Sequence, residues 1–419
     1  MRIGNATLPD GTTADVEVED GTITAVGDLG GEYDVDATGK LLFPGAIDAH
    51  VHFRQPGYGH KETWETGSQS AAAGGVTTVV DQPNTSPPTT TGDAFDQKAA
   101  FADQSIVDWG INGGVTEDWD PESLFARPLF ALGEVFLADS TGDMGIEADL
   151  FAEAVELAGQ HDVTVTVHAE DADLFDESAT ERDDADAWSA YRAAEAEAAA
   201  VERACEVGAE FETDIHIAHT STPEGVDAAA AAGATCEVTP HHLFLSRDDL
   251  PELGTFGRMN PPLRSEERRE AVFERVADGT VDIVATDHAP HTREEKDASI
   301  WDAPSGVPGV ETMVPLLLEE ARKGTLSYER VRDLVAANPA AIFDLPEKGR
   351  IQEGMDADLA LYDTDEPRAI RGEDLHSNCG WTPFEGKQGV FPEWTMLRGE
   401  VVWDAEDGFG EAAGQNVRE

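Results

Sequence analysis

Short apolar runs alternate with longer Ala- and Glu-rich stretches through the middle of the chain. Segments such as 145–161 and 189–208 have the periodicity of amphipathic helices. The apolar runs between such segments have the length and composition of buried strands. These strand candidates are 45–52, 76–82, 107–113, 133–138, 163–168, 214–219, 235–240 and 282–286. Eight strand–helix repeats between about residues 45 and 345 predict a (β/α)8 barrel of the TIM type, in the α/β class.

Both ends of the chain show a different pattern. Residues 1–44 contain alternating runs with a turn at Asp20-Gly21, and residues 346–419 return to short strands and turns. The simplest arrangement pairs the two ends in one small β domain. The expected division is therefore 1–44 and 346–419 in the small domain, with the barrel over 45–345.

Acidic residues dominate the charge. The chain has 85 acidic and 28 basic residues, a net charge of −57, and the acids are spread along its whole length. Such self-repulsion destabilises a compact chain in dilute buffer, whereas concentrated salt screens it. The composition predicts a halophilic protein and argues against nucleic-acid binding through a basic surface.

No apolar run is long enough to span a membrane, and the N-terminal segment lacks the apolar core of a signal peptide. The cysteines Cys205, Cys236 and Cys379 are widely spaced, without a CxxC pair. This pattern indicates a reducing compartment and no thiolate metal site. We expect a cytoplasmic protein without membrane contacts.

Histidines and an aspartate stand at the ends of several predicted strands. His50 and His52 are two residues apart and therefore leave the same face of one strand. His168 and His219 end later strands, and Asp287 ends the last. Barrel enzymes carry their chemistry at the C-terminal ends of strands, and this donor set suits zinc or a similar metal.

Glu134 lies among apolar residues in the segment "LFALGEVFLAD", residues 129–139. A carboxylate inside a dry strand is costly unless it is paired or coordinates a metal. The local sequence leaves open which group this carboxylate contacts.

Six motifs resemble those of the amidohydrolase superfamily, and within its cyclic amidohydrolases those of the dihydroorotase family. They are "HVHFRQPG" (50–57), "PNT" (83–85), "HAE" (168–170), "HIAHTS" (216–221), "NPPLR" (260–264) and "TDHAPH" (286–291). The resemblance covers nearly the full chain.

The resemblance implies two zinc ions held by these residues. His50, His52 and Asp287 would bind one ion, and His168 and His219 the second. Many relatives bridge the ions with a carbamylated lysine on strand four, but this chain has no lysine between Lys98 and Lys296. Glu134 would then be the bridge, with Asp139 and a one-metal site as the alternatives.

The resemblance also implies a substrate and a reaction. The family closes N-carbamoyl-L-aspartate to L-dihydroorotate and water, reversibly, in pyrimidine biosynthesis. Arg54, Asn84 and His291 would bind the substrate carboxylate, and Asn260 the ring amide or carbonyl. Asp287 would be the catalytic residue that moves the proton between water and the ring nitrogen.

Two rival interpretations follow from the same family. Allantoinases and hydantoinases share the barrel and the metals, but those acting on uncharged rings do not use the arginine of "FRQPG" with "PNT". Some dihydroorotase-like chains have lost their metal ligands and only hold aspartate carbamoyltransferase; the intact ligand set argues against this role. A homodimer and an association with aspartate carbamoyltransferase are both compatible with the resemblance.

Overall fold

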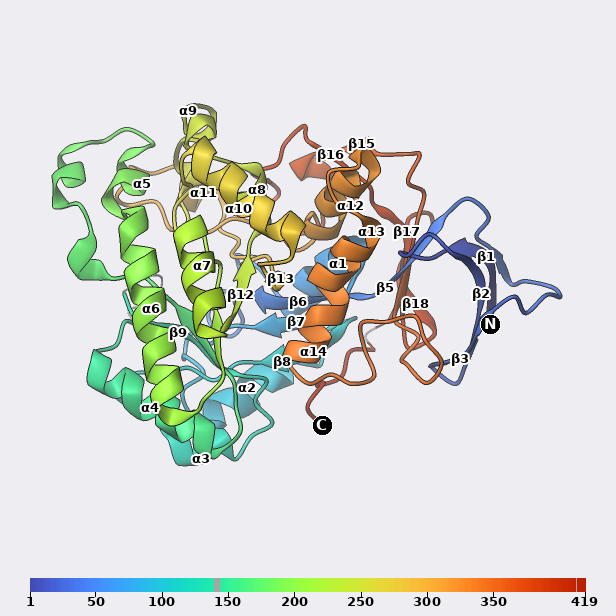
Figure 1. Ribbon diagram of the computed structural model, residues 1–419, viewed down its shortest axis with the longest axis horizontal. Helices are drawn as coiled ribbons and strands as arrows, with labels where there is room; N and C mark the ends of the chain where they lie inside the picture. The colour runs from blue at the N-terminus through green and yellow to red at the C-terminus, as the bar shows by residue number, and fades with distance from the viewer. Residues whose placement is uncertain (139–143, 412) are drawn as a thin grey trace.

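A barrel and a β-sheet beside it make up the molecule (Figure 1). The computed structural model describes residues 1–138, 144–411 and 413–419. No helix in these ranges is both long and apolar enough to cross a membrane.

Eight parallel strands within the described ranges form the barrel, in agreement with the eight predicted runs. One group pairs in the order β6-β7-β8 and the other in the order β9-β10-β11-β12-β13. Isolated parallel bridges, Gly113 to Leu132 and Val51 to His288, close the ring between the groups. The strands are β6 Ala46–Val51, β7 Val76–Asp81, β8 Asp108–Ile111, β9 Leu132–Phe136, β10 Val165–His168, β11 Ile215–Ile217, β12 Thr235–Val238 and β13 Ile283–Val284.

Helices surround this ring. They are α1 Trp64–Ala73, α2 Gly92–Ala102, α3 Pro121–Phe125, α4 Ala148–Gln160, α5 Ala187–Tyr191, α6 Ala194–Phe211, α7 Pro223–Ala232, α8 Pro240–Phe244, α9 Leu250–Leu253, α10 Glu266–Asp278, α11 Arg293–Lys296, α12 Met313–Lys323, α13 Tyr328–Arg332 and α14 Asn338–Ile342. Short turns are η1 Ala172–Leu174, η2 Glu177–Glu181, η3 Arg247–Asp249, η4 Gly254–Gly257, the π-helical η5 Asp333–Ala337 and η6 Gly372–Asp374.

Local sequence sets the helix ends, as α7 illustrates. Thr222 precedes the helix and its hydroxyl accepts a hydrogen bond from the Gly225 backbone N–H, while Pro223 occupies the first turn. Gly233 ends the helix in a left-handed conformation, with φ of 77°, which glycine adopts without a Cβ penalty.

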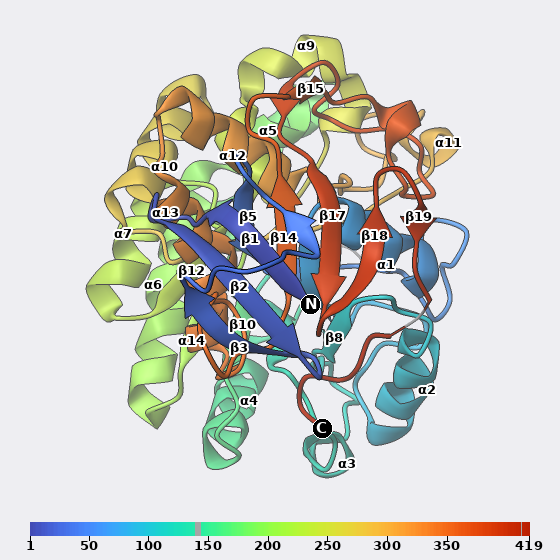
Figure 2. The ribbon, with the colours of Figure 1, turned by 90° about the vertical axis from the view of Figure 1, so that its right-hand side faces the viewer.

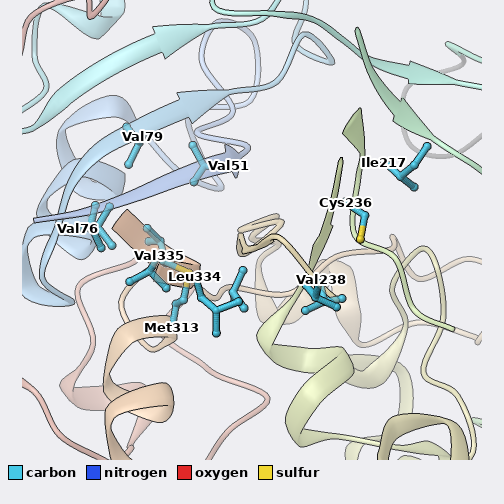
Figure 3. Close-up of a cluster of buried hydrophobic side chains, with 14 of the residues drawn as sticks. Val51, Val76, Val79, Ile217, Cys236, Val238, Met313, Leu334 and Val335 are labelled. Atoms are coloured by element: carbon cyan, nitrogen blue, oxygen red, sulfur yellow. The ribbon is translucent and has the colours of Figure 1, made fainter. Parts of the chain in front are cut away.

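The main core fills the space between the strands and their helices. Figure 3 shows Met313, Leu334 and Val335, from α12 and η5, lying together beside strand side chains. Val76 is among these strand residues and, like the other three, is buried. Burying apolar side chains on the outer barrel wall leaves the strand ends free to carry polar groups.

The two chain ends share one sheet, as predicted. Its order is β19-β18-β17-β14-β5-β1-β2-β3, with β4 beside β1, and β5 pairs with β14 to join the ends (Figure 2). The strands are β1 Arg2–Thr7, β2 Thr13–Glu19, β3 Thr22–Gly27, β4 Val35–Asp36, β5 Leu41–Pro44, β14 Leu359–Tyr362, β17 Pro392–Leu397, β18 Glu400–Asp404 and β19 Gly408–Phe409.

Two C-terminal segments pack away from this sheet. Between β15 (Arg368–Ala369) and β16 (Gln388–Gly389), Trp381 and Phe384 join a core cluster with Met259 and Leu263 of the barrel loops. The final residues return to the barrel, where the backbone N–H of Trp109 on β8 donates to the backbone carbonyl of Gln415. The division at residues 44 and 345 stays a prediction.

Candidate active site

The strand ends bring together the six predicted metal ligands. His50 lies in β6, Glu134 in β9 and His168 at the end of β10. His52, His219 and Asp287 lie in the loops just after β6, β11 and β13. All six side chains are buried. His219 and Asp287 have positive φ angles of 34° and 46°, which are unusual for residues with a Cβ. Such backbone strain is found where surrounding structure fixes a functional side chain.

One group of ligand atoms comes from the end of β6 and from the loop after β13. His52 Nε2 lies 2.9 Å from Asp287 Oδ1, and His50 Nε2 lies 3.6 Å from the same oxygen. The ligand atoms of these three residues all fall within 4.8 Å of one another, close enough for one ion.

A second group gathers around Glu134. Its Oε1 is 2.8 Å from His168 Nδ1 and 2.6 Å from His219 Nε2, and these two nitrogens are 3.0 Å apart. Its Oε2 instead lies 3.5 Å from His50 Nε2 and 4.0 Å from His52 Nε2. Each carboxylate oxygen therefore faces a different histidine pair, as a bridging ligand requires.

Hydrogen bonds behind the histidines fix which ring nitrogen carries the proton. His50 Nδ1 lies 2.6 Å from Glu237 Oε1, and His52 Nδ1 lies 2.6 Å from Asn84 Oδ1. Each Nδ1–H donates to its oxygen, so each Nε2 presents a lone pair to the cluster.

The Nε2 lone pairs of His50 and His52 face the carboxylate oxygens of Glu134 and Asp287. Without a cation between them, these groups would repel one another. The buried His50 Nε2, for example, has no hydrogen-bond partner within the described part of the chain. This donor set therefore fits metal ions.

The carboxylates and histidines of the cluster shift one another's pKa values. Burial opposes charging of His168, but Glu134 and Glu170 raise its pKa to about 9. Burial likewise opposes ionisation of Glu134, yet His219 and His168 hold its pKa well below the usual value. Strong attraction between this carboxylate and positive charge is what a metal ligand needs.

A cavity opens at the cluster and is lined by both Glu134 and Asp287. Arg54, Asn84 and Asn260 line it together with His52 and Asp287, so predicted substrate and metal residues share one space. Arg54 is 3% exposed. Its positive φ of 65° makes the backbone turn shortly after β6 ends. A buried guanidinium provides a planar pair of donors for a carboxylate.

Asn260 and His291 take different positions around this cavity. The Asn260 carbonyl oxygen accepts from Trp188 Nε1 at 2.9 Å and from Ser305 Oγ at 3.2 Å. His291 is fully buried behind Arg54, with its Nε2 3.2 Å from Arg54 Nη2.

Two site carboxylates were given no role by the sequence analysis. Glu237 supports His50 and also accepts from the His219 backbone N–H at 3.1 Å. Glu170 contacts His168 Nε2 at 2.9 Å and pairs with Arg192 at 2.6 Å. Glu237 stands in the apolar strand "CEV", the same signal that singled out Glu134. Asp139, the alternative bridge, lies outside the described residues.

Comparisons with known proteins decide the family. A model of the amidohydrolase family matches residues 41–402. The chain belongs to this family. It is 69% identical to a dihydroorotase from Halobacterium salinarum, over 100% of this chain and 99% of the relative. It is also 43% identical to a dihydroorotase from Methanosarcina acetivorans, over 95% and 91% of the two chains.

Solved amidohydrolase structures share the whole fold. The L-hydantoinase from Arthrobacter aurescens superposes with a TM-score of 0.94 at 30% identity, over 99% of this chain and 98% of that chain. This similarity confirms the TIM-barrel prediction with its added β domain. The family is typically metal-dependent, in keeping with the buried His, Glu and Asp groups.

Proposed function

We propose that the protein is a dihydroorotase, interconverting N-carbamoyl-L-aspartate and L-dihydroorotate in pyrimidine biosynthesis. The observation that carries this proposal is the buried Arg54 in the cavity beside the metal cluster. Among the described residues no carboxylate lies within ion-pair distance of this guanidinium, although Asp287 of the same cavity attracts it. Both substrates bring a carboxylate that can pair with it directly, and an uncharged ring does not.

Substrate binding uses the cavity lining. Arg54 takes the carboxylate in a paired contact, and the Asn84 and Asn260 amides provide further polar contacts. Asn84 also accepts from His52, so one side chain joins substrate and metal binding. His291 supports Arg54 from behind.

Two zinc ions fit the ligand set. His50, His52 and Asp287 would hold one, His168 and His219 the other, and Glu134 would bridge them. Metal held there would supply Lewis-acid chemistry, polarising the ring carbonyl and making a water molecule more acidic.

Asp287 moves the proton. Burial favours its neutral acid, but His52 and His50 hold its pKa below the usual value, so the carboxylate is available as a base. In ring opening it accepts the proton of the attacking water and transfers it to the ring nitrogen as the C–N bond breaks. Ring closure runs through the same group in reverse.

The test is ring opening of L-dihydroorotate by the purified chain in molar KCl, with and without added zinc. Allantoin and hydantoin serve as uncharged controls. Zinc-dependent turnover of dihydroorotate alone is the expected result. Turnover of an uncharged ring instead would overturn the assignment of Arg54 to a carboxylate.

Assembly and location stay predictions. A homodimer, an association with aspartate carbamoyltransferase and a cytoplasmic location are each compatible with this activity. Light scattering of the purified protein, alone and mixed with that enzyme, measures the first two.

A further inference from the structure

A small charged cluster lies directly behind Arg54. Lys61, from the loop before α1, places its Nζ 3.1 Å from His291 Nδ1 and 3.1 Å from Glu295 Oε1. The His291 Nε2 is 2.9 Å from the Ser305 carbonyl oxygen. The Lys61 side chain is 14% exposed, and His291 is fully buried.

These contacts determine the protonation of His291. An ammonium group can only donate, so the Nδ1 atom facing Lys61 must present its lone pair. The single ring proton then sits on Nε2 and is donated to the Ser305 carbonyl. As a result, Nε2 offers no lone pair to Arg54 Nη2, although the two atoms are 3.2 Å apart.

Burial and nearby cations keep this ring neutral. Burial, together with the charges of Arg54, Lys61 and Lys296, lowers the pKa of His291 to about 3, while Glu295 acts in the opposite direction. Without the Lys61 ammonium, Nδ1 no longer has to present its lone pair. The ring proton can then sit on Nδ1, which faces the Glu295 carboxylate with Oε2 3.7 Å away.

Losing Lys61 disturbs Arg54. A His291 ring with its proton moved to Nδ1 would accept a hydrogen bond from Arg54 Nη2 at Nε2 and draw the guanidinium away from the cavity.

We propose that Lys61 is a positioning and specificity-determining residue for the substrate carboxylate. Its ammonium holds His291 in the neutral Nε2–H form and so keeps Arg54 directed into the cavity, and it adds a second positive charge behind the anion subsite. This inference rests on the proposed function for its substrate, but the state of His291 can be measured without any substrate.

The kinetic test compares three variants in the zinc-loaded protein. Lys61→Met should raise KM for L-dihydroorotate about 10- to 100-fold with little change in kcat, because a charge-supported contact made equally in ground and transition states is weakened. Lys61→Arg keeps a charged donor and should restore KM. His60→Ala is the control, since His60 contacts the same Glu295 but is 59% exposed and does not touch His291.

The second measurement is ¹⁵N NMR of histidine-labelled protein, with the His291 signals assigned from a His291→Asn variant. We expect wild type to show a neutral ring with its proton on Nε2 from pH 5 to 8. Lys61→Met should show a neutral ring with its proton on Nδ1, while Lys61→Arg and His60→Ala should match wild type.

The outcomes separate this inference from the proposed function. A Lys61→Met variant with wild-type KM, or a wild-type His291 protonated at Nδ1, would overturn the role of Lys61. A wild-type protein inactive on dihydroorotate, yet with the expected NMR spectrum, would overturn the substrate while leaving the control of His291 by Lys61 intact.

Discussion

Glu134 presents one carboxylate oxygen to His168 and His219 and the other to His50 and His52. This division explains why a carboxylate is buried in an otherwise apolar strand. Metal ions between the two histidine pairs would compensate both its charge and the lone pairs that face it.

Glu134→Gln removes the shared negative charge at nearly constant volume. We expect bound zinc to fall from the proposed two ions per chain to one or fewer, and turnover to fall at least about 100-fold. Mutating even a residue that only hydrogen-bonds to a metal ligand typically lowers metal affinity or activity about 10- to 100-fold. Elemental analysis after dialysis and the ring-opening rate measure both effects. Glu311→Gln is the control, because Glu311 is equally buried but contacts Ser70 and His376. Full zinc content in Glu134→Gln would refute the bridge.

Asp287→Asn tests the proton transfer itself. An amide can still ligate through its oxygen, so much of the metal should remain, but it cannot accept and return a proton. We expect turnover to fall about 100- to 10,000-fold. Asp282→Asn is the matched control. Asp282 immediately precedes the first residue of β13, at the end of the strand away from Asp287, and this variant should stay active. Wild-type turnover in Asp287→Asn would exclude this residue as the base.

Some site residues could be predicted from the sequence and others could not. His50, His52 and Glu134 stand out because polar groups at the ends or in the middle of apolar strands need a partner. Glu237 carries the same signal and was missed. The position of Lys61 behind His291 is not encoded in any spacing, since these residues lie 230 positions apart and meet only when two loops fold together.

At the scale of single elements, a buried ion pair ties α2 to the strand ends. Lys98 Nζ on α2 donates to Asp81 Oδ2 at 2.6 Å and to the Gln82 carbonyl at 2.5 Å. The other Asp81 oxygen accepts from the Phe53 N–H at 2.6 Å. Phe53 lies between His52 and Arg54, so this ion pair stabilises the segment that carries a proposed metal ligand and the proposed substrate-binding arginine.

Lys98→Met should destabilise the fold strongly. Both side chains of the pair are fully buried, and removing one leaves an uncompensated charge, which costs about 3–5 kcal/mol. Denaturant unfolding in molar KCl measures the loss. Asp96→Asn on the same helix breaks only the exposed pair with Arg127 and should leave unfolding unchanged. Equal effects of the two variants would contradict the importance of burial.

The elements themselves were largely predictable. The eight barrel strands show as apolar runs because they are covered by helices outside and packed side chains inside. The return of residues 415–418 to β8 was not predictable, because it rests on backbone contacts such as Trp109 N–H to the Gln415 carbonyl and on no sequence pattern.

For the molecule as a whole, the excess of acidic residues sets how stability depends on salt. Pairing each of the 28 basic residues with one acid would still leave a net charge of −57. Ion pairs such as Arg182 with Asp184 and Asp186 therefore relieve only part of the repulsion. A 69% identical relative from Halobacterium salinarum supports the halophilic character inferred from this composition.

Salt should therefore stabilise the fold by screening. The Debye length falls from about 8 Å at 0.15 M ionic strength to about 3 Å at 1 M, so repulsion between neighbouring acids weakens steeply over this range. We expect Tm, followed by circular dichroism, to rise by at least about 5 °C between 0.15 and 2 M KCl, a gain of a few kcal/mol.

Sucrose separates screening from a general solvent effect, because it favours compact states through exclusion from the surface and carries no charge. At low salt it should recover only part of the stability that KCl provides. A Tm that is independent of KCl, or equally raised by sucrose, would mean that the acidic surface does not repel itself in the folded state. The net charge would then have to be offset by bound cations, which equilibrium dialysis against KCl would detect.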